Sequence, residues 1–229
     1  MIGLVTGSQP FAGLPDNPAA TLLPKVEGEV FHGVTIRTVT TQVQLATVPE
    51  TVCDLIAQTR PVFHLALGLA LGAPALRLET TAINRLDFGV ADNFGARPTG
   101  GGPIVPDGPA ARLATWDAAD LVARLRADGL PAVISHHAGT HLCNVVLYTS
   151  IGAMAANGLP GPSGFLHLPY LPEQVARFQA SAPPQGDSAP LTERTLPSMS
   201  FDLQLRALRL VLDALSLSAT TRPEGGSER

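Results

Sequence analysis

The sequence has 229 residues, of which 45% are hydrophobic and 15% are charged, so it can bury a large core and is not a disordered chain. Its net charge of -4 argues against a nucleic-acid partner, because phosphate binding needs a basic surface. No apolar run approaches the roughly 18 residues that span a bilayer, the opening MIGLVTGSQPF lacks the features of a signal peptide, and two cysteines make no disulfide framework, so we expect a cytoplasmic protein that binds no membrane.

Strand-like and helix-like segments alternate along the chain. Short apolar or β-branched runs predict strands, and apolar residues spaced three or four apart predict helices. The predicted strands are residues 2–7, 34–39, 62–68, 76–84, 132–136 and 164–170, and the predicted helices are residues 47–58, 117–129, 142–158 and 200–215. This alternation predicts one α/β domain over residues 1–229, an α/β/α sandwich with a mostly parallel mixed sheet flanked by helices. In such sheets the functional site lies beyond the carboxyl ends of strands.

Three segments depart from the alternation. Residues 87–109 are rich in Gly, Pro and Asp and predict a long loop, which is uncommon unless it is functional or flexible. Residues 179–195 have the composition of a flexible segment. From Ser216 onward the sequence predicts a polar tail that frays.

Cys143 follows the turn-like AGTHL at the start of a predicted apolar helix. The unpaired amides and partial positive charge of a helix start favour a thiolate, and the same amides can hold an oxyanion. The alternative is a core cysteine in the first helical turn, and this local geometry leaves the two interpretations about even. Cys53 falls among apolar residues at helical spacing, so we interpret it as a packing residue.

A thiolate nucleophile needs a base, and the base needs an orienting group. The candidate bases are His32, His64, His136, His137, His141 and His167. His167 follows Phe165 at period two near the end of an apolar strand, where a catalytic base and a hydrogen-bonded core histidine are both open interpretations. Glu79 lies in a strand expected to be mostly buried, which is costly for a carboxylate unless it is paired. A sheet-edge position or an ion pair with a neighbouring arginine is the alternative explanation for Glu79.

Other chemistries have little support. The histidines at 136, 137 and 141 lack an accompanying cysteine or carboxylate at metal-ligand spacing, so we expect no metal and no cofactor. Catalysis by paired carboxylates rests on nothing beyond scattered Asp and Glu. The sequence contains no Walker motif and no dinucleotide-type glycine motif.

Six segments carry a resemblance to a known family. They are VTGSQPFAGLPDNPA, LETTAIN, ADN followed by GPIVPDGP, AGTHLCNVVLY, SGFLHLPYLPEQ and LPSMSFDLQLRAL. In order and spacing the sequence, from about Ile2 to Leu215, resembles the pyroglutamyl peptidase I (pyrrolidone carboxyl peptidase) family of cysteine peptidases. Members of that family remove an N-terminal pyroglutamate from peptides.

The resemblance implies a role for each matching residue. Cys143 is the implied nucleophile, His167 the general base and acid, and Glu79 the group that orients His167. The implied substrate-binding residues are Phe11, Ser8, Thr41, Val90, His141 and Leu142. The resemblance further implies peptide substrates with an N-terminal pyroglutamate, no cofactor, and a homo-oligomer, expected to be a tetramer.

Departures from the family pattern gather at the substrate end. Ser8 stands where the first of two phenylalanines is expected, and His141 where the family has Phe or Tyr. Gly89 takes the place of an arginine that in the family lies close to the catalytic cysteine, and the sequence does not assign Arg77 or Arg85 as its substitute. We therefore expect an intact triad with an altered ring pocket. The alternatives are a cysteine hydrolase of the same fold that acts on another lactam or amide, and a weakly active or non-catalytic homologue.

Overall fold

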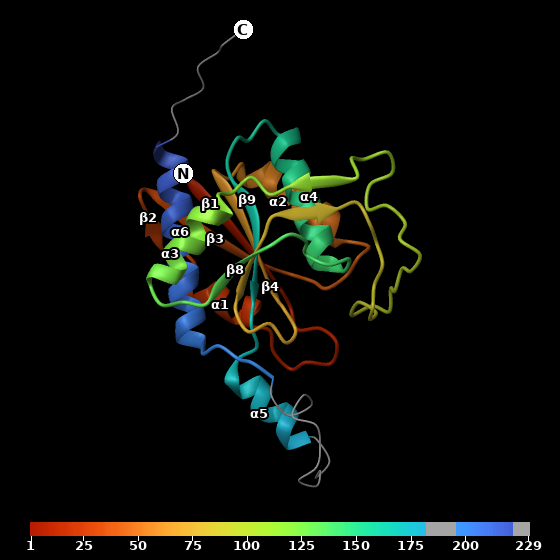
Figure 1. Cartoon of the computed structure of the whole chain (residues 1–229). Coiled ribbons are helices and arrows are strands. Elements are labelled where there is room, and N and C mark those ends of the chain that lie inside the picture. Colours follow the sequence, from red (N-terminus) through yellow and green to blue (C-terminus); the bar gives the residue numbers. More distant parts are fainter. Residues whose placement is uncertain (182–195, 222–229) are drawn as a thin grey trace.

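The computed structural model describes residues 1–181 and 196–221, which form a seven-stranded sheet with helices on both faces (Figure 1). The sheet consists of β1 (Ile2–Ser8), β2 (Val30–Phe31), β3 (Val34–Thr41), β4 (Phe63–Leu69), β5 (Leu76–Glu79), β8 (Ala132–Ser135) and β9 (Ser163–Leu168). A separate two-stranded ribbon pairs β6 (Thr81–Ile83) with β7 (Ala111–Leu113). The helices of the described residues are α1 (Pro18–Val26), α2 (Val48–Thr59), α3 (Ala118–Ala127), α4 (Leu142–Ala156), α5 (Pro172–Ser181) and α6 (Phe201–Thr221).

The strand order of the main sheet is β2-β3-β1-β4-β9-β5-β8. β1 runs parallel to β3 and β4, and β4 runs parallel to β9. The direction reverses between β9 and β5, which pair antiparallel, and β5 then runs parallel to β8. The predicted mostly parallel mixed sheet is therefore confirmed, and its reversal lies beside β9, the strand that carries His167.

Apolar side chains divide between two layers. One cluster joins the sheet to α1, α3 and α6, and a second joins the opposite face to α2 and α4 (Figure 1). Alternate residues of β9 serve the two layers: Leu166 and Leu168 belong to the first cluster and Phe165 to the second. This period of two confirms the predicted α/β/α sandwich and directs His167 toward the α2–α4 side, because side chains two residues apart share a face.

The prediction that the C-terminal tail frays from Ser216 is wrong. α6 continues to Thr221, and Ser216, where a frayed tail was expected, is fully buried. Ser216 follows Leu212 by one helical turn, so it lies on the face that packs against the sheet. The expected flexible segment begins inside α5, which includes residues 179–181, and residues 182–195 lie outside the described residues.

The interpretation of Cys53 as a packing residue is also wrong, because its side chain is exposed. The buried residues of α2 are Val48, Val52 and Ile56, each one turn after the last. Cys53 follows Val52 by a single position, which rotates it about 100° around the helix and away from the core.

The predicted strand over residues 76–84 is two strands. β5 lies in the main sheet, whereas β6 leaves it and pairs with β7. Thr80 separates them and uses its backbone N–H to hydrogen-bond to Ser135 O. Because only Thr80 lies between the two strands, the sequence shows one continuous alternating segment although the strands belong to different sheets.

Two helices were not predicted. α1 begins at Pro18, and the side chain of Asn17 caps it by accepting the backbone N–H of Ala19. Both signals were present in the sequence, since Asn is a favoured N-cap residue and Pro suits the first helical position. α5 likewise begins with a proline and carries Glu173 in its first turn.

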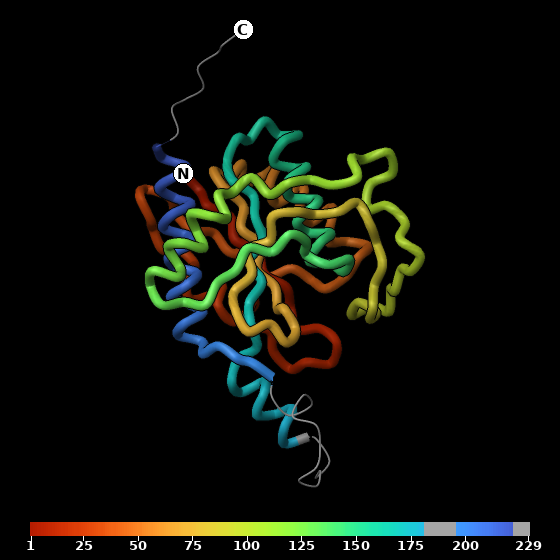
Figure 2. The backbone as a smooth tube through the Cα atoms, viewed as in Figure 1, coloured from red at the N-terminus to blue at the C-terminus, as the bar shows by residue number. Residues whose placement is uncertain are grey.

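Residues 87–109 form the expected long loop, which extends to one side of the molecule beyond α4 (Figure 2). Asp92 anchors it: its buried carboxylate accepts backbone N–H bonds from Leu45 (2.7 Å), Phe94 (2.9 Å) and Ala96 (2.9 Å). Asn93 donates its side-chain amide to Pro10 O at 2.8 Å. These bonds join the loop to the segments that follow β1 and β3, close to the predicted substrate-binding residues Ser8, Phe11 and Thr41.

Candidate active site

Cys143 lies in the first turn of α4 and is half-buried. The next residue, Asn144, is fully buried and clamps this turn to β6: its Oδ1 accepts the N–H of Ile83 at 2.9 Å and its Nδ2 donates to Ile83 O at 2.8 Å. The first backbone amides of a helix have no partner within the helix. The clamp therefore holds a thiol and free amide donors together at one fixed place over the sheet.

Gly68 of β4 makes room for the thiol. A Cβ added at this position would lie 3.2 Å from Cys143 Sγ and 2.6 Å from Cζ of Phe165. A Phe ring and a sulfur atom therefore occupy the space above Gly68 that a side chain would take. The close approach of α4 to the sheet depends on glycine at this position.

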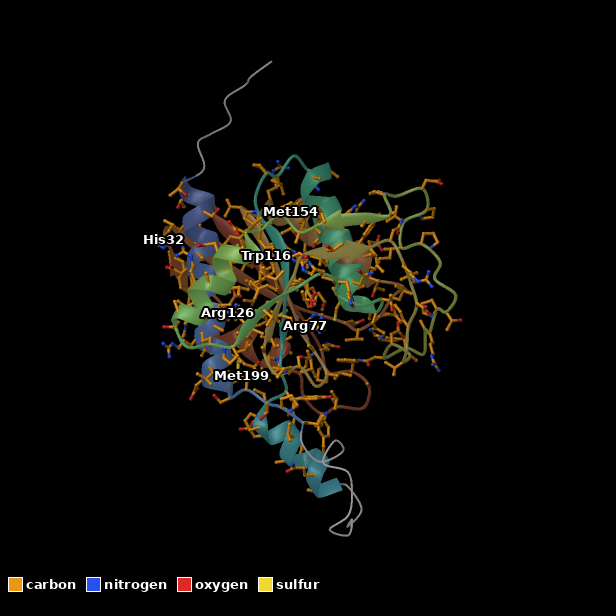
Figure 3. All side chains as sticks on the ribbon, in the orientation of Figure 1. His32, Arg77, Trp116, Arg126, Met154 and Met199 are labelled. Atoms are coloured by element: carbon orange, nitrogen blue, oxygen red, sulfur yellow. The ribbon has the colours of Figure 1, made fainter. Side chains whose placement is uncertain are left out.

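His167 and Glu79 come together across the antiparallel β5–β9 pair. Arg77 lies directly opposite His167 and Glu79 opposite Phe165, so all four side chains share one face. His167 Nδ1 lies 2.8 Å from Glu79 Oε1. Trp116, labelled in Figure 3, donates its indole N–H to the backbone oxygen of Glu79 at 3.1 Å. Glu79 has no solvent exposure, and β5 lies between β9 and β8, so the sheet-edge explanation for this carboxylate is wrong.

Burial of the His167 ring opposes its charged form, but two partners outweigh this effect. The charge of Cys143 and a hydrogen bond with Cys143, together with the hydrogen bond and charge of Glu79, raise the pKa of His167 to about 9. An imidazole held between a thiol and a carboxylate can take the thiol proton, and the carboxylate stabilises the resulting cation.

Two cavities meet at Cys143. The larger is a cleft of about 420 Å³, and the smaller is a hollow of about 20 Å³, close to the space of one water molecule. Phe11 and His141 line both cavities. Val90 lines the cleft, and Ser8 and Leu142 line the hollow.

Thr41 is the predicted substrate-binding residue that lines neither cavity. It is buried at the end of β3, beside Ser8, its register partner on β1. Its hydroxyl lies 3.5 Å from Gly7 O. The structure thus brings five of the six predicted substrate-binding residues to Cys143 and places Thr41 beside one of them, on the neighbouring strand.

His141 forms one wall of the hollow. Its ring centroid lies 4.1 Å from that of Phe88 and 6.1 Å from that of Phe11. Burial lowers the pKa of His141, although a hydrogen bond to Val90 O and the charge of Asp92 oppose the shift. The neutral ring donates Nε2–H to Val90 O at 3.2 Å, so it serves as an aromatic wall that is also bonded to the long loop.

A guanidinium lines the cleft from β5. Arg77, labelled in Figure 3, donates Nε–H to Glu79 Oε1 at 3.2 Å and Nη2–H to Ser135 Oγ at 2.7 Å. Gly89 also lines the cleft, with open space where a Cβ would be. Arg85 instead pairs with Asp87 at 3.4 Å and does not line the cleft. Of the two arginines near Gly89 in sequence, the structure brings Arg77 to the site.

The other histidines are placed differently from His167. His64 is buried against Thr6 Oγ1 at 3.0 Å, and burial lowers the pKa of His64 to about 4. His32 pairs with Asp213 on the surface, and His136 lies near Thr80 Oγ1. His137 lines the cleft and accepts the N–H of Gly139.

The described residues contain no group of three or more His, Cys, Asp or Glu side chains arranged to hold a metal ion. Across residues 1–181 and 196–221, none of the helices is both long enough and apolar enough to cross a membrane.

Sequence reasoning missed Gly68 and Asn144 as parts of the site. Gly68 ends the apolar strand run VFHLALG, and a glycine inside a strand is a signal of close approach by another group. Asn144 directly follows Cys143 in an otherwise apolar helix, where a buried amide requires partners.

An α/β/α sandwich with a thiol at a helix start, an imidazole against it and a buried carboxylate behind the ring defines a cysteine hydrolase. The family model described as pyroglutamyl peptidase matches residues 1–217, and the chain belongs to this family.

Known relatives match over nearly the full length. The pyrrolidone-carboxylate peptidase of Cupriavidus taiwanensis is 35% identical over 227 residues, covering 97% of each protein. That of Pyrococcus furiosus is 30% identical over 210 residues, covering 92% of this chain and 95% of the relative. The crystal structure of a mutant pyrrolidone carboxyl peptidase from P. furiosus superposes with a TM-score of 0.86 at 30% identity, over 95% of this chain and 99% of the other.

Proposed function

We propose that this protein is a pyroglutamyl peptidase, a cysteine hydrolase that removes an N-terminal pyroglutamate from peptides. Family membership over residues 1–217 supports the activity. The observation that carries the proposal is the His167 ring, bonded to Glu79 Oε1 at 2.8 Å on one side and hydrogen-bonded to Cys143 on the other. Cys143, His167 and Glu79 have the chemistry of nucleophile, base and orienting group that amide cleavage by a thiol requires.

The proposed reaction begins with proton transfer from Cys143 to Nε2 of His167. Cys143 Sγ attacks the carbonyl carbon that joins pyroglutamate to the next residue, forming a C–S bond and a tetrahedral oxyanion. The backbone N–H groups at the start of α4 face no partner within the helix and stabilise this oxyanion. His167 then gives its proton to the leaving nitrogen as the C–N bond breaks.

The second half of the reaction regenerates the thiol. Water attacks the thioester while His167 accepts a proton from that water. The C–S bond then breaks to release pyroglutamate, and His167 returns the proton to Cys143 Sγ. Glu79 stabilises the imidazolium that forms in each half and holds the ring with Nε2 toward the sulfur. The buried bond between Nδ1 and Glu79 fixes this orientation, and Trp116 holds the backbone of Glu79 in turn.

The pyroglutamyl ring has its proposed place between Phe11 and His141. The two ring centroids are 6.1 Å apart, whereas a planar ring stacked between two others needs about 7 Å. The hollow of about 20 Å³ must also widen. We therefore propose that Phe11 moves outward when substrate binds, with Ser8, Leu142 and Val90 completing the surroundings of the ring. Thr41 supports Ser8 from the neighbouring strand and does not touch the ring.

The test measures the turnover of a chromogenic pyroglutamyl amide by wild-type protein, by Cys143→Ala and by the matched control Cys53→Ala. Cys53 is exposed on α2, so its removal changes the thiol content without touching the site. We expect turnover by wild-type protein and by Cys53→Ala, and none by Cys143→Ala. Absence of turnover by wild-type protein, or turnover that survives in Cys143→Ala, contradicts the proposal.

A second candidate function is hydrolysis of a different lactam or amide by the same triad. The polar groups of Ser8 and His141 in the hollow favour it, because they change what the ring pocket can recognise. Rapid alkylation of Cys143 by iodoacetamide, together with poor pyroglutamyl turnover, is the result that distinguishes it.

We also propose a homo-oligomer, specifically a tetramer, and a cytoplasmic, reducing environment. The family resemblance supports the first, and the need to keep Cys143 reduced supports the second. Light scattering of the purified protein measures its oligomeric state directly.

A further inference from the structure

One permanently charged side chain lines the cleft beside Cys143. Arg77 is the only lysine or arginine among the described residues that line it, and no aspartate or glutamate lines it. Most of the remaining wall is apolar, including Leu69, Leu71 and Ala138. The guanidinium is paired with Glu79 at 3.2 Å, but it is the only charged Lys, Arg, Asp or Glu side chain among the described residues of the cleft, so it favours an anion there.

The internal contacts of Arg77 leave part of its guanidinium available. Glu79 takes the Nε donor and Ser135 takes one donor of Nη2. Arginine has five N–H donors, so among the described contacts donors remain on both terminal nitrogens. The side chain is 37% exposed, so these donors are accessible to a molecule in the cleft.

Arg77 lies on the leaving-group side of the sulfur. It lines the cleft and not the hollow, whereas Phe11 and His141 line both cavities. With the pyroglutamyl ring in the hollow, the next residue of the peptide, which departs as the leaving group, occupies the cleft. Arg77 is directly opposite His167 in the β5–β9 pair. The guanidinium therefore starts only one strand away from the imidazole that contacts the sulfur. A peptide extends about 3.5 Å per residue, which places the first leaving residue near the guanidinium.

We propose that Arg77 binds a carboxylate carried by the residue that follows pyroglutamate. This inference rests on the proposed function and predicts a preference for peptides with an acid at that residue. The acid is either the free carboxylate of a pyroglutamyl dipeptide or an acidic side chain. Both present the planar pair of oxygens that a guanidinium binds with two parallel hydrogen bonds.

The experiment uses two pairs of substrates that differ only in charge. Pyroglutamyl-alanine is compared with its C-terminal amide, and pyroglutamyl-glutamate amide with pyroglutamyl-glutamine amide. We expect kcat/KM to favour the acid about tenfold in at least one pair, and that pair identifies the source of the carboxylate. Because both members of a pair use the same triad, their ratio is independent of any general loss of activity.

Arg77→Gln is the test variant and Arg85→Gln the matched control. Both remove one positive charge from the segment between residues 76 and 86, but only Arg77 lines the cleft. The ratio of kcat/KM for the acidic substrate to kcat/KM for its neutral partner is expected to fall to about one in Arg77→Gln. In Arg85→Gln this ratio is expected to stay at its wild-type value. A residue that only held Glu79 in place would slow both substrates equally and leave the ratio unchanged.

Two results overturn the inference: no preference for the acid in either pair, or a preference that survives in Arg77→Gln. Absence of turnover for all four substrates contradicts the proposed function instead. In that case the affinities of the same peptides for Cys143→Ala, measured by calorimetry, decide the inference. The inference is supported if Cys143→Ala binds the acidic peptide more tightly than its neutral partner and if this difference disappears when Arg77→Gln is added. Equal affinities for the two peptides overturn the inference.

Discussion

Substitution of Gly68 by alanine tests the contact between the sheet and the candidate nucleophile. A Cβ at this position would lie 2.6 Å from Phe165 Cζ and 3.2 Å from Cys143 Sγ, whereas carbon atoms pack at about 3.5–4.0 Å. Phe165 is 1% exposed and cannot swing into solvent. The Phe165 ring must therefore move by about 1 Å, which displaces the His167 ring packed against it at a centroid distance of 4.6 Å, and Cys143 Sγ must move by a smaller amount.

The expected effects follow from this displacement. Overpacking a close-packed interior costs about 1–3 kcal/mol in the free energy of unfolding. A displacement of about 1 Å in a reacting group lowers the rate about 10²-fold. We expect Gly68→Ala to lose about 10²-fold in kcat/KM for a pyroglutamyl amide, measured per folded protein, and to unfold at a lower denaturant concentration.

Gly3→Ala is the matched control. Gly3 lies in β1, and its added Cβ would lie 2.3 Å from Cζ of Phe63, another buried Phe of the sheet. This variant imposes a similar clash that does not involve the thiol, so it should lose stability but keep kcat/KM per folded protein. Wild-type kcat/KM in Gly68→Ala, or an equal loss of kcat/KM in Gly3→Ala, would refute the reasoning.

Two further predictions concern the ionisable groups. In Cys143→Ala the His167 ring loses the charge and hydrogen bond of Cys143 while burial and Glu79 remain, so we expect the pKa of His167 to fall from about 9, as measured by NMR titration of the ring. An unchanged pKa would show that the thiol does not interact with the ring. Asp92→Ala leaves three backbone N–H groups without their acceptor, so we expect a loss of about 2–3 kcal/mol in the free energy of unfolding and faster hydrogen exchange in residues 87–109. Exchange as slow as in the wild-type protein would contradict the anchoring role of this carboxylate.

Local signals singled out the members of the candidate triad as candidates, and the family resemblance assigned their roles. Cys143 lies in the first turn of a predicted apolar helix, His167 lies at period two in an apolar strand, and Glu79 is a charged residue in a strand predicted to be buried. The strand and helix periods also predicted the two-layer fold, since they depend only on the spacing of apolar residues.

Burial at individual positions was less predictable. Cys53 and Ser216 were both misjudged, because the exposure of a residue near the edge of a helical stripe depends on how far the neighbouring layer extends. α6 packs along the sheet past Leu215, which the polar composition after that residue does not reveal.

The sequence by itself determined the alternation of strands and helices and the kinds of chemical group available to the site. Only the tertiary structure decided that Arg77, and not Arg85, lines the cleft beside Cys143. The physical reason is that the antiparallel pairing of β5 with β9 is non-local: its register sets His167 opposite Arg77 and within hydrogen-bond distance of Glu79, and no local pattern specifies that register.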